Sequence, residues 1–342
     1  MTEVDAAAAR YARVQAVMAR HGVGALCVAT PHLATFAAGA RRVQVAGSGG
    51  TTPWVVVLAG APAAFVFTTD PDGTPAWMPR AHVEPLRWDR VRQLARIADL
   101  VAGTSGTVAC DVVAPALRDV LQGRELVDAA PVIAEATAPR TAGEIAAIGR
   151  ALAAARAALG AATGVLAPGA TSSTVLAALS RAMSPAGARF PLFEAIVRRD
   201  GVRLGSQDSF RDGDVIGVDV GLVLDGHAGV VADTVGCGRA DVTAARRSWF
   251  RALCAIAKRC RAGTSLAALR DAAVDARATS DDGLLAHGLG VGIEDPLVDG
   301  DGGDQTLRAG TVLVLAPRLG VFRASRALVV TDGAPRWLEP AP

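Results

Sequence analysis

A chain of 342 residues, 51% of them hydrophobic, is long enough for two domains of ordinary size with substantial cores. Its formal net charge of +2 excludes the concentrated basic excess that nucleic-acid-binding domains carry. The five cysteines are scattered and odd in number, which excludes a disulfide framework and favours a reduced, cytoplasmic location.

The sequence also argues against a membrane partner. It contains no continuous apolar run of about 18 residues, the length needed to span a bilayer. The N-terminus is acidic and lacks the basic start and apolar run of a signal peptide, which again favours the cytoplasm. Lys258 is the only lysine among many arginines, and we interpret this bias as that of a GC-rich bacterial genome.

Residues 1–137 are predicted to form a small α/β domain. Ala6–His21 has helical periodicity and ends before Gly22, and Val23–Ala29 follows as a buried strand. Strands and helices continue to alternate, which indicates an α/β unit. The further elements predicted are strands at Pro53–Leu58, Ala63–Thr68 and Thr107–Asp111, a helix at Arg90–Ala102, and a helix that runs toward Leu121.

A second domain is predicted over residues 138–342, with the boundary near Ala138. Ile145–Leu166 is a long, alanine-rich amphipathic helix that ends before Pro168-Gly169. Thr171–Met183 is predicted as a second helix, because hydroxyl residues at its start can cap it.

Asp219 is a charged residue inside an apolar strand, so it needs a partner. We expect Asp225-Gly226 to form a two-residue turn between this strand and the next. In that register Asp219 lies opposite Ala232, and Val230 is its diagonal neighbour on the same face. Asp233 then points to the opposite face, unless a bulge shifts the register.

Several motifs match, in order and spacing, those of the creatinase / aminopeptidase P / prolidase superfamily, the pita-bread hydrolases. The linker Arg140–Ile145 also resembles the family's K-S/T-x-x-E-I segment, with arginine in place of lysine. The resemblance implies an α+β chain in which a small α/β domain precedes a pita-bread domain. The matching motifs are Phe210–Gly221, Leu224–Val230, His287–Gly290, Leu307–Pro317, Arg323 and Val329–Gly333.

The resemblance implies a centre of two divalent metals held by two aspartates, one histidine and two glutamates. Only Asp219 and His287 match that set, and the other three positions hold Val230, Ala316 and Ser325. One carboxylate and one imidazole are too few ligands for a pair of metal ions. These two residues could hold one ion weakly, with water completing its shell, but we expect no metal in the purified protein and no other cofactor.

A second histidine of the family, seven residues after His287, is replaced by Glu294. The upstream histidine that metal-free creatinase uses is also missing, since residues 172–226 contain no histidine. The candidates for acid/base catalysis are therefore His287, Asp219 and Glu294, with Asp219 expected to orient His287. The positions expected to bind a substrate are Arg323, Ser325 and Val230.

Two functions remain open at this stage. The first is a metal-independent hydrolase or lyase that acts on a small amino-acid-derived, amidino or peptide-like substrate. The second is an inactive pseudo-peptidase that binds a ligand or a protein. The polar residues retained in the cleft favour the enzyme. The resemblance also implies a homodimer, in which Val43–Val57, with its loop Gly47–Gly50, reaches the partner's active site.

Overall fold

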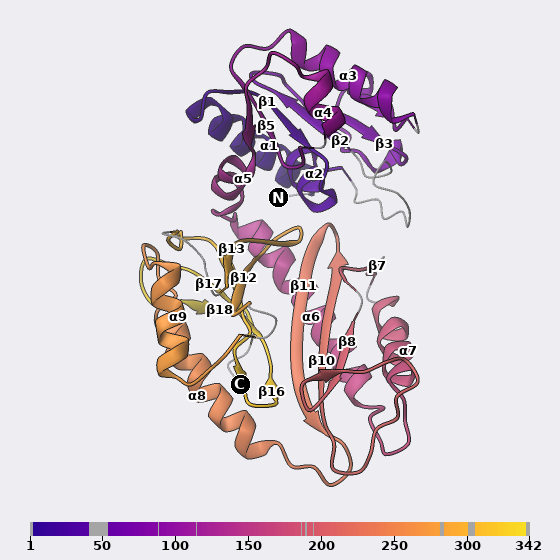
Figure 1. Cartoon of the computed structure of the whole chain (residues 1–342), viewed down its shortest axis with the longest axis vertical. Helices are drawn as coiled ribbons and strands as arrows, with labels where there is room; N and C mark the ends of the chain where they lie inside the picture. The colour runs from indigo at the N-terminus through magenta and orange to yellow at the C-terminus, as the bar shows by residue number, and fades with distance from the viewer. Residues whose placement is uncertain are drawn as a thin grey trace. The chain divides into compact units, whose positions relative to one another are not determined.

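The computed structural model divides the chain into two compact units, Met1–Thr137 and Ala138–Pro342 (Figure 1). The loop Gly47–Gly50 and residues 43–53 of the segment expected to reach a partner subunit lie outside the part of the chain that the structure describes. The described residues are 3–40, 54–87, 89–113, 115–185, 187–188, 190–193, 195–280, 284–299 and 305–339.

The N-terminal unit is built on a six-stranded mixed sheet in the order β4-β3-β2-β1-β5-β6. The predicted helix at Arg90–Ala102 is confirmed with the same bounds, and Asp89 caps it through hydrogen bonds from Val91 N and Arg92 N. The other strands and helices expected here are also present, with ends shifted by a few residues. The elements are α1 (Glu3–Arg20), β1 (Val23–Val28), α2 (Pro31–Ala38), β2 (Trp54–Leu58), β3 (Phe65–Thr68), η1 (Pro71–Gly73), η2 (Arg80–His82), β4 (Val83–Pro85), α3 (Arg90–Ala102), β5 (Thr107–Cys110), α4 (Pro115–Val120), β6 (Leu126–Asp128) and α5 (Ala130–Thr137).

The C-terminal unit opens with two helices, α6 (Ala142–Thr163) and α7 (Ser172–Met183). A capping box begins α6: the Thr141 side chain accepts from Glu144 N at 3.2 Å, and the Glu144 carboxylate accepts from Thr141 N at 2.9 Å. The linker motif therefore has a local physical role, because it satisfies backbone N–H groups that the first helical turn leaves without partners.

Two antiparallel sheets follow these helices. The first has the order β11-β10-β8-β9, with β7 also paired to β10, and the second has the order β13-β12-β14-β17-β18. The elements are β7 (Phe190–Pro191), β8 (Ile196–Arg199), β9 (Val202–Arg203), β10 (Val215–Leu224), β11 (His227–Gly236), α8 (Thr243–Ala257), α9 (Leu266–Asp275), β12 (Ala286–Leu289), β13 (Ile293–Val298), β14 (Val312–Leu315), β15 (Arg318–Leu319), β16 (Phe322–Arg323), β17 (Arg326–Val329) and β18 (Arg336–Trp337).

The edge of β11 joins the two sheets. Ala228 N donates to Gly290 O at 2.8 Å, and Ser325 N donates to Ala232 O at 3.1 Å. Helix α6 packs against β10 and β11, as Figure 1 shows. A Cβ at Gly229 would collide with the α6 backbone at Ala151, so glycine permits the close approach of strand and helix.

Helix α6 is also long and apolar enough, by length and composition, to cross a membrane, a property that the sequence analysis did not anticipate. In the described residues its apolar window is 44% buried, and residues such as Ile148 and Leu152 form part of the core with β10 and β11. Burial of this kind is typical of the core helix of a globular unit.

A buried ion pair connects the start of α6 to the second sheet. Arg140 donates to the carboxylate of Glu294 on β13, and only 4% and 2% of these two side chains are exposed. Glu294 also accepts from Val291 N at 2.7 Å and Gly292 N at 3.2 Å. A Cβ at Gly290 would collide with both charged groups, so this glycine makes room for the pair.

Glu294→Gln is expected to destabilise the C-terminal unit by about 3–5 kcal/mol, because it removes the negative partner from a buried ion pair with Arg140. Urea unfolding followed by far-ultraviolet circular dichroism measures the change. Asp72→Asn is the matched control, since Asp72 and its partner Arg80 are 91% and 75% exposed and such pairs contribute little. Equal midpoints for the two variants would show that the buried pair is not needed.

Candidate functional site

The position of Asp219 follows from the β10–β11 hairpin. Asp219 pairs with Ala232, Gly221 pairs with Val230, and the ten-residue register contains no shift. The predicted register is therefore confirmed, and the bulge that could have brought Asp233 next to Asp219 does not form. Asp225 and Gly226 have φ of 47° and 74°, as a two-residue hairpin turn of the primed type requires.

Asp219 forms ion pairs with two arginines. Arg198 Nη1 contacts Asp219 Oδ2, and Arg323 Nη1 contacts Oδ1. Arg198 comes from β8, where it pairs in register with Gly217 of β10, and Arg323 comes from β16. Both carboxylate oxygens of Asp219 are thus engaged by guanidinium groups.

Arg198 is a site residue that the sequence analysis did not propose. Its contact with Asp219 depends on the pairing of β8 with β10, which brings together residues 21 positions apart in the chain. An arginine in a short strand is commonly solvent-exposed, whereas 12% of this side chain is exposed. Arg198 could have been identified from the sequence only if the pairing of β8 with β10 had been known beforehand.

His287 lies on β12 and is buried. Its Nδ1 atom is 3.0 Å from Gly288 O. Since a carbonyl only accepts, Nδ1 carries the proton and Nε2 keeps its lone pair in the neutral ring. The pKa of His287 is lowered to about 4, chiefly by burial; the bond to Gly288 O opposes this shift, and the charge of Arg323 contributes to it.

We expected Asp219 to orient His287, and the structure differs on this point. Gly288 O holds the Nδ1 side of the imidazole, while Asp219 binds the two arginines. The nearby charge of Arg323 is positive and disfavours the protonated ring. A neutral His287 is therefore the form that this environment supports.

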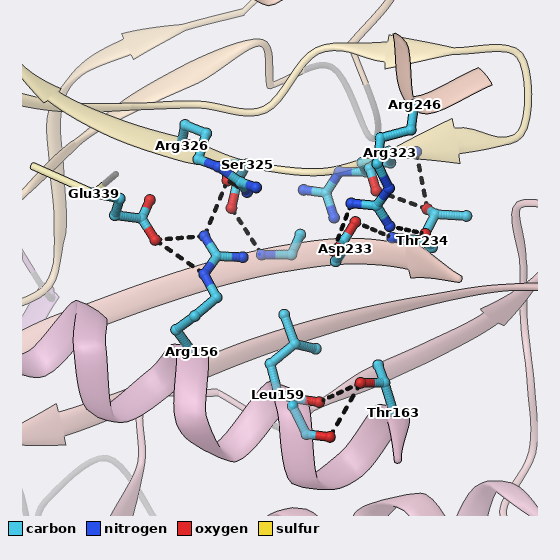
Figure 2. Close-up of polar contacts among 12 residues, drawn as sticks. Arg156, Leu159, Thr163, Asp233, Thr234, Arg246, Arg323, Ser325, Arg326 and Glu339 are labelled. Atoms are coloured by element: carbon cyan, nitrogen blue, oxygen red, sulfur yellow. Dashed lines mark hydrogen bonds and ion pairs between the residues drawn. The ribbon is translucent and has the colours of Figure 1, made fainter. Parts of the chain in front are cut away.

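Ser325 replaces a family glutamate, and its side chain has a structural contact. Its Oγ accepts from Ala232 N at 2.7 Å, while its carbonyl accepts from Arg156 at 3.2 Å and Arg326 at 2.7 Å (Figure 2). These bonds attach the segment before β17 to β11. At the other two replaced positions, Ala316 is buried and Val230 is partly buried beside the core.

Two further ion pairs border the site. Arg246 on α8 contacts Asp233 at 2.9 Å, and Arg156 on α6 contacts Glu339 at 2.5 Å (Figure 2). Arg246 also donates to Thr234 O, and Thr234 Oγ1 donates to Arg323 O at 2.7 Å. Asp233 is thus engaged by an arginine, as Asp219 is.

The residues at this position do not fit a two-metal centre. Within the described parts of the chain, there is no group of three or more His, Cys, Asp or Glu side chains that could hold a metal ion. Of the two matching ligands, Asp219 has a guanidinium on each oxygen and His287 offers one nitrogen. A pair of divalent ions requires several anionic ligands, which this set lacks.

A recess opens beside Asp219. Its volume is about 290 Å³ when the open solvent at its mouth is included. The part accessible to the centre of a water molecule is about 10 Å³. Three of its lining side chains are arginines. The lining residues are Arg198, Gly201, Gly217, Asp219, Asp233, Thr234, Arg318, Val321 and Arg323.

Solved structures similar to this chain cover nearly its full length. A dipeptidase PepE from Mycobacterium ulcerans is 21% identical, with a TM-score of 0.77, and the match covers 100% of this chain and 97% of that chain. A prolidase from Pyrococcus horikoshii OT3 is 16% identical, with a TM-score of 0.75 and coverage of 97% and 98%.

An X-Pro aminopeptidase from Thermotoga maritima MSB8 is also 16% identical, with a TM-score of 0.76 and coverage of 97% and 98%. Identities this low show the shared fold alone. No curated protein sequence matches the chain significantly.

The sequence model of metallopeptidase family M24 matches residues 146–332, more than half of the chain. Together with the structural matches, this confirms the expected α+β architecture of an N-terminal domain followed by a pita-bread domain. The chain therefore belongs to metallopeptidase family M24.

Proposed function

We propose that the protein is a metal-independent member of this family, whose cleft binds a small molecule and does not cleave peptides. The observation that carries the proposal is the double ion pair at Asp219. Two guanidinium groups occupy the oxygens that a metal ion would need. Because each guanidinium already carries a positive charge, a divalent cation beside them would be repelled.

The hydrogen bonds of Glu294 and Ser325 support a binding function over a catalytic one. Glu294 accepts from Arg140 and from two backbone N–H groups, so its carboxylate is committed to a buried structural contact. The hydroxyl of Ser325 is bonded to β11. A general acid or base needs a group that can exchange a proton with the substrate, and these two are held elsewhere.

A metal-independent acid/base enzyme is the second candidate, and one observation favours it. The bond from Nδ1 to Gly288 O leaves the Nε2 lone pair of His287 able to accept a proton. Such an enzyme would be a hydrolase or lyase for an amino-acid-derived, amidino or peptide-like substrate. A base with a pKa of about 4 is weak at neutral pH, which makes this candidate the less favoured one.

The purified protein is expected to contain well under one metal ion per chain, even after preparation with added manganese, cobalt or zinc. It is also expected to leave Xaa-Pro peptides intact, because a metal-bound hydroxide performs that hydrolysis. Elemental analysis and a peptidase assay provide the measurements, with a prolidase of this family purified in parallel as the positive control. A content near two ions per chain would contradict the proposal.

A ligand found by thermal-shift screening of metabolites is expected to stay chemically unchanged over hours with the protein, as mass spectrometry can show. His287→Gln is expected to bind that ligand with similar affinity, because His287 is not among the residues that line the recess. Conversion by the natural protein, together with its loss in His287→Gln at an unchanged melting temperature, would replace the binding proposal with the enzyme.

The pH dependence of stability tests whether His287 is held neutral. Its pKa is about 4 in the folded protein and roughly 6.5 when unfolded, so the unfolded chain binds more protons between these values. This contribution to stability is complete above pH 6.5 and is lost as the pH falls toward 4, by about 3 kcal/mol at most.

His287→Gln removes the titrating ring, so the stability of the variant is expected to fall less between pH 6.5 and 4 than that of the natural protein. Urea unfolding at a series of pH values measures the difference. Parallel profiles for the two proteins would show that His287 protonates normally in the fold.

A further inference from the structure

The recess beside Asp219 has an unusual balance of charge. Among the described residues that line it, Arg198, Arg318 and Arg323 stand against two aspartates. One of these, Asp233, already forms an ion pair with Arg246 of α8, which does not line the recess. The surroundings are therefore electropositive, where a metal centre of this family would be rich in carboxylates.

The three arginines come from separate elements and converge on one place. Arg198 lies on β8, Arg318 on β15 and Arg323 on β16. Asp219 contacts both Arg198 and Arg323, and this fixes the orientation of the two guanidinium groups. Guanidinium groups held in place before binding lose little conformational entropy when a ligand arrives.

Arg318 lines the recess close to Gly201. Its Nε donates to Gly320 O at 2.7 Å within its own hairpin. Its guanidinium lies over Gly201, where φ is 84° and a Cβ would collide with the arginine. A side chain at Gly201 would be disfavoured for two reasons: its positive φ, and the space that Arg318 occupies.

The size of the recess indicates how much of a ligand can enter it. The 290 Å³ of the recess includes open solvent, so most of this space belongs to its open mouth. Only about 10 Å³ can hold the centre of a water molecule, which corresponds to roughly one water. The terminal group of a ligand would therefore bind at the open mouth of the recess, and the rest of the ligand would extend outward.

We propose that the recess binds the terminal oxyanion of a small ligand, a carboxylate or a phosphate, between Arg198, Arg318 and Arg323. Planar guanidinium forks match the oxygens of both groups. This inference names the class of ligand for the binding function proposed above. It rests on that proposed function, because it requires that no metal ion occupies the position beside Asp219.

The experiment titrates sodium phosphate, sodium acetate and neutral acetamide into the full-length protein at constant ionic strength. The melting temperature and isothermal titration calorimetry report binding. A saturable rise in melting temperature with phosphate or acetate, and none with acetamide, is expected. A response to phosphate alone identifies a phosphorylated ligand, and a response to acetate alone identifies a carboxylate. No saturable effect of either anion would overturn the proposal.

Arg318→Gln is the informative variant, because Arg318 lines the recess, whereas replacing Arg198 or Arg323 would also remove a contact of the buried Asp219. Loss of one charge-assisted contact is expected to weaken anion binding about tenfold or more. Arg318→Lys keeps the positive charge but loses the planar guanidinium group. Its anion affinity is expected to lie between that of the natural protein and that of Arg318→Gln. Unchanged anion affinity in Arg318→Gln would place the anion elsewhere and overturn the proposal.

Arg92→Gln is the matched control. It makes the same change in net charge at a side chain that is 77% exposed, on α3 of the other unit. Anion affinity within twofold of the natural protein is expected for this control, and a loss equal to that of Arg318→Gln would overturn the proposal. The assay needs neither turnover nor a metal, so a failed metal or turnover prediction is distinguishable from a failure of anion binding.

Discussion

A carboxylate inside an apolar strand must replace its lost hydration with close partners, or the folded state is destabilised by several kcal/mol. Asp219 meets this requirement with Arg198 from its own sheet and Arg323 from the β15–β16 hairpin. The same contacts tie that hairpin to β10. The position that would hold metal ions in a metallopeptidase of this fold thus becomes a fixed arrangement of positive side chains around one negative group.

The replaced ligand positions are consistent with this change of charge. Four carboxylates close together repel one another unless cations lie between them. With Val230, Ala316 and Ser325 at three of those positions, the remaining carboxylate needs only monovalent partners. Ser325 adds a hydrogen bond to Ala232, so the segment that would present a glutamate instead links β11 to the start of β17. At this one position, a structural hydrogen bond is present where the family has a metal ligand.

Residue periodicity and turn and cap residues were enough to predict much of the secondary structure from the sequence. They did not predict contacts between residues far apart in the chain. Alternating residues and the turn at Asp225-Gly226 were enough to predict which residue faces Asp219. The hydroxyl residues predicted to cap α7 identified where that helix begins, whereas α6 begins at Ala142, three residues before the predicted start at Ile145. The partners of Asp219 and Glu294 could not be predicted, because Arg198 and Arg140 reach them only after strands from distant parts of the chain have paired. His287 was identified by its motif, whereas its low pKa depends on burial and on Arg323.

The contacts that hold the C-terminal unit together lie largely outside the positions that match metal ligands of the family. Its internal ties are the Arg140–Glu294 pair, the backbone bonds that link β11 to Gly290 and Ser325, and the close packing of α6 on Gly229. None of these contacts uses a metal ligand position other than Ser325, where the new residue strengthens the link. Because these contacts do not involve the residues that line the recess, substitutions in the recess can alter ligand binding without removing them. The recess beside Asp219, lined by three arginines, is suited to recognising an anion, and the chemistry of metal-activated water is not required for that.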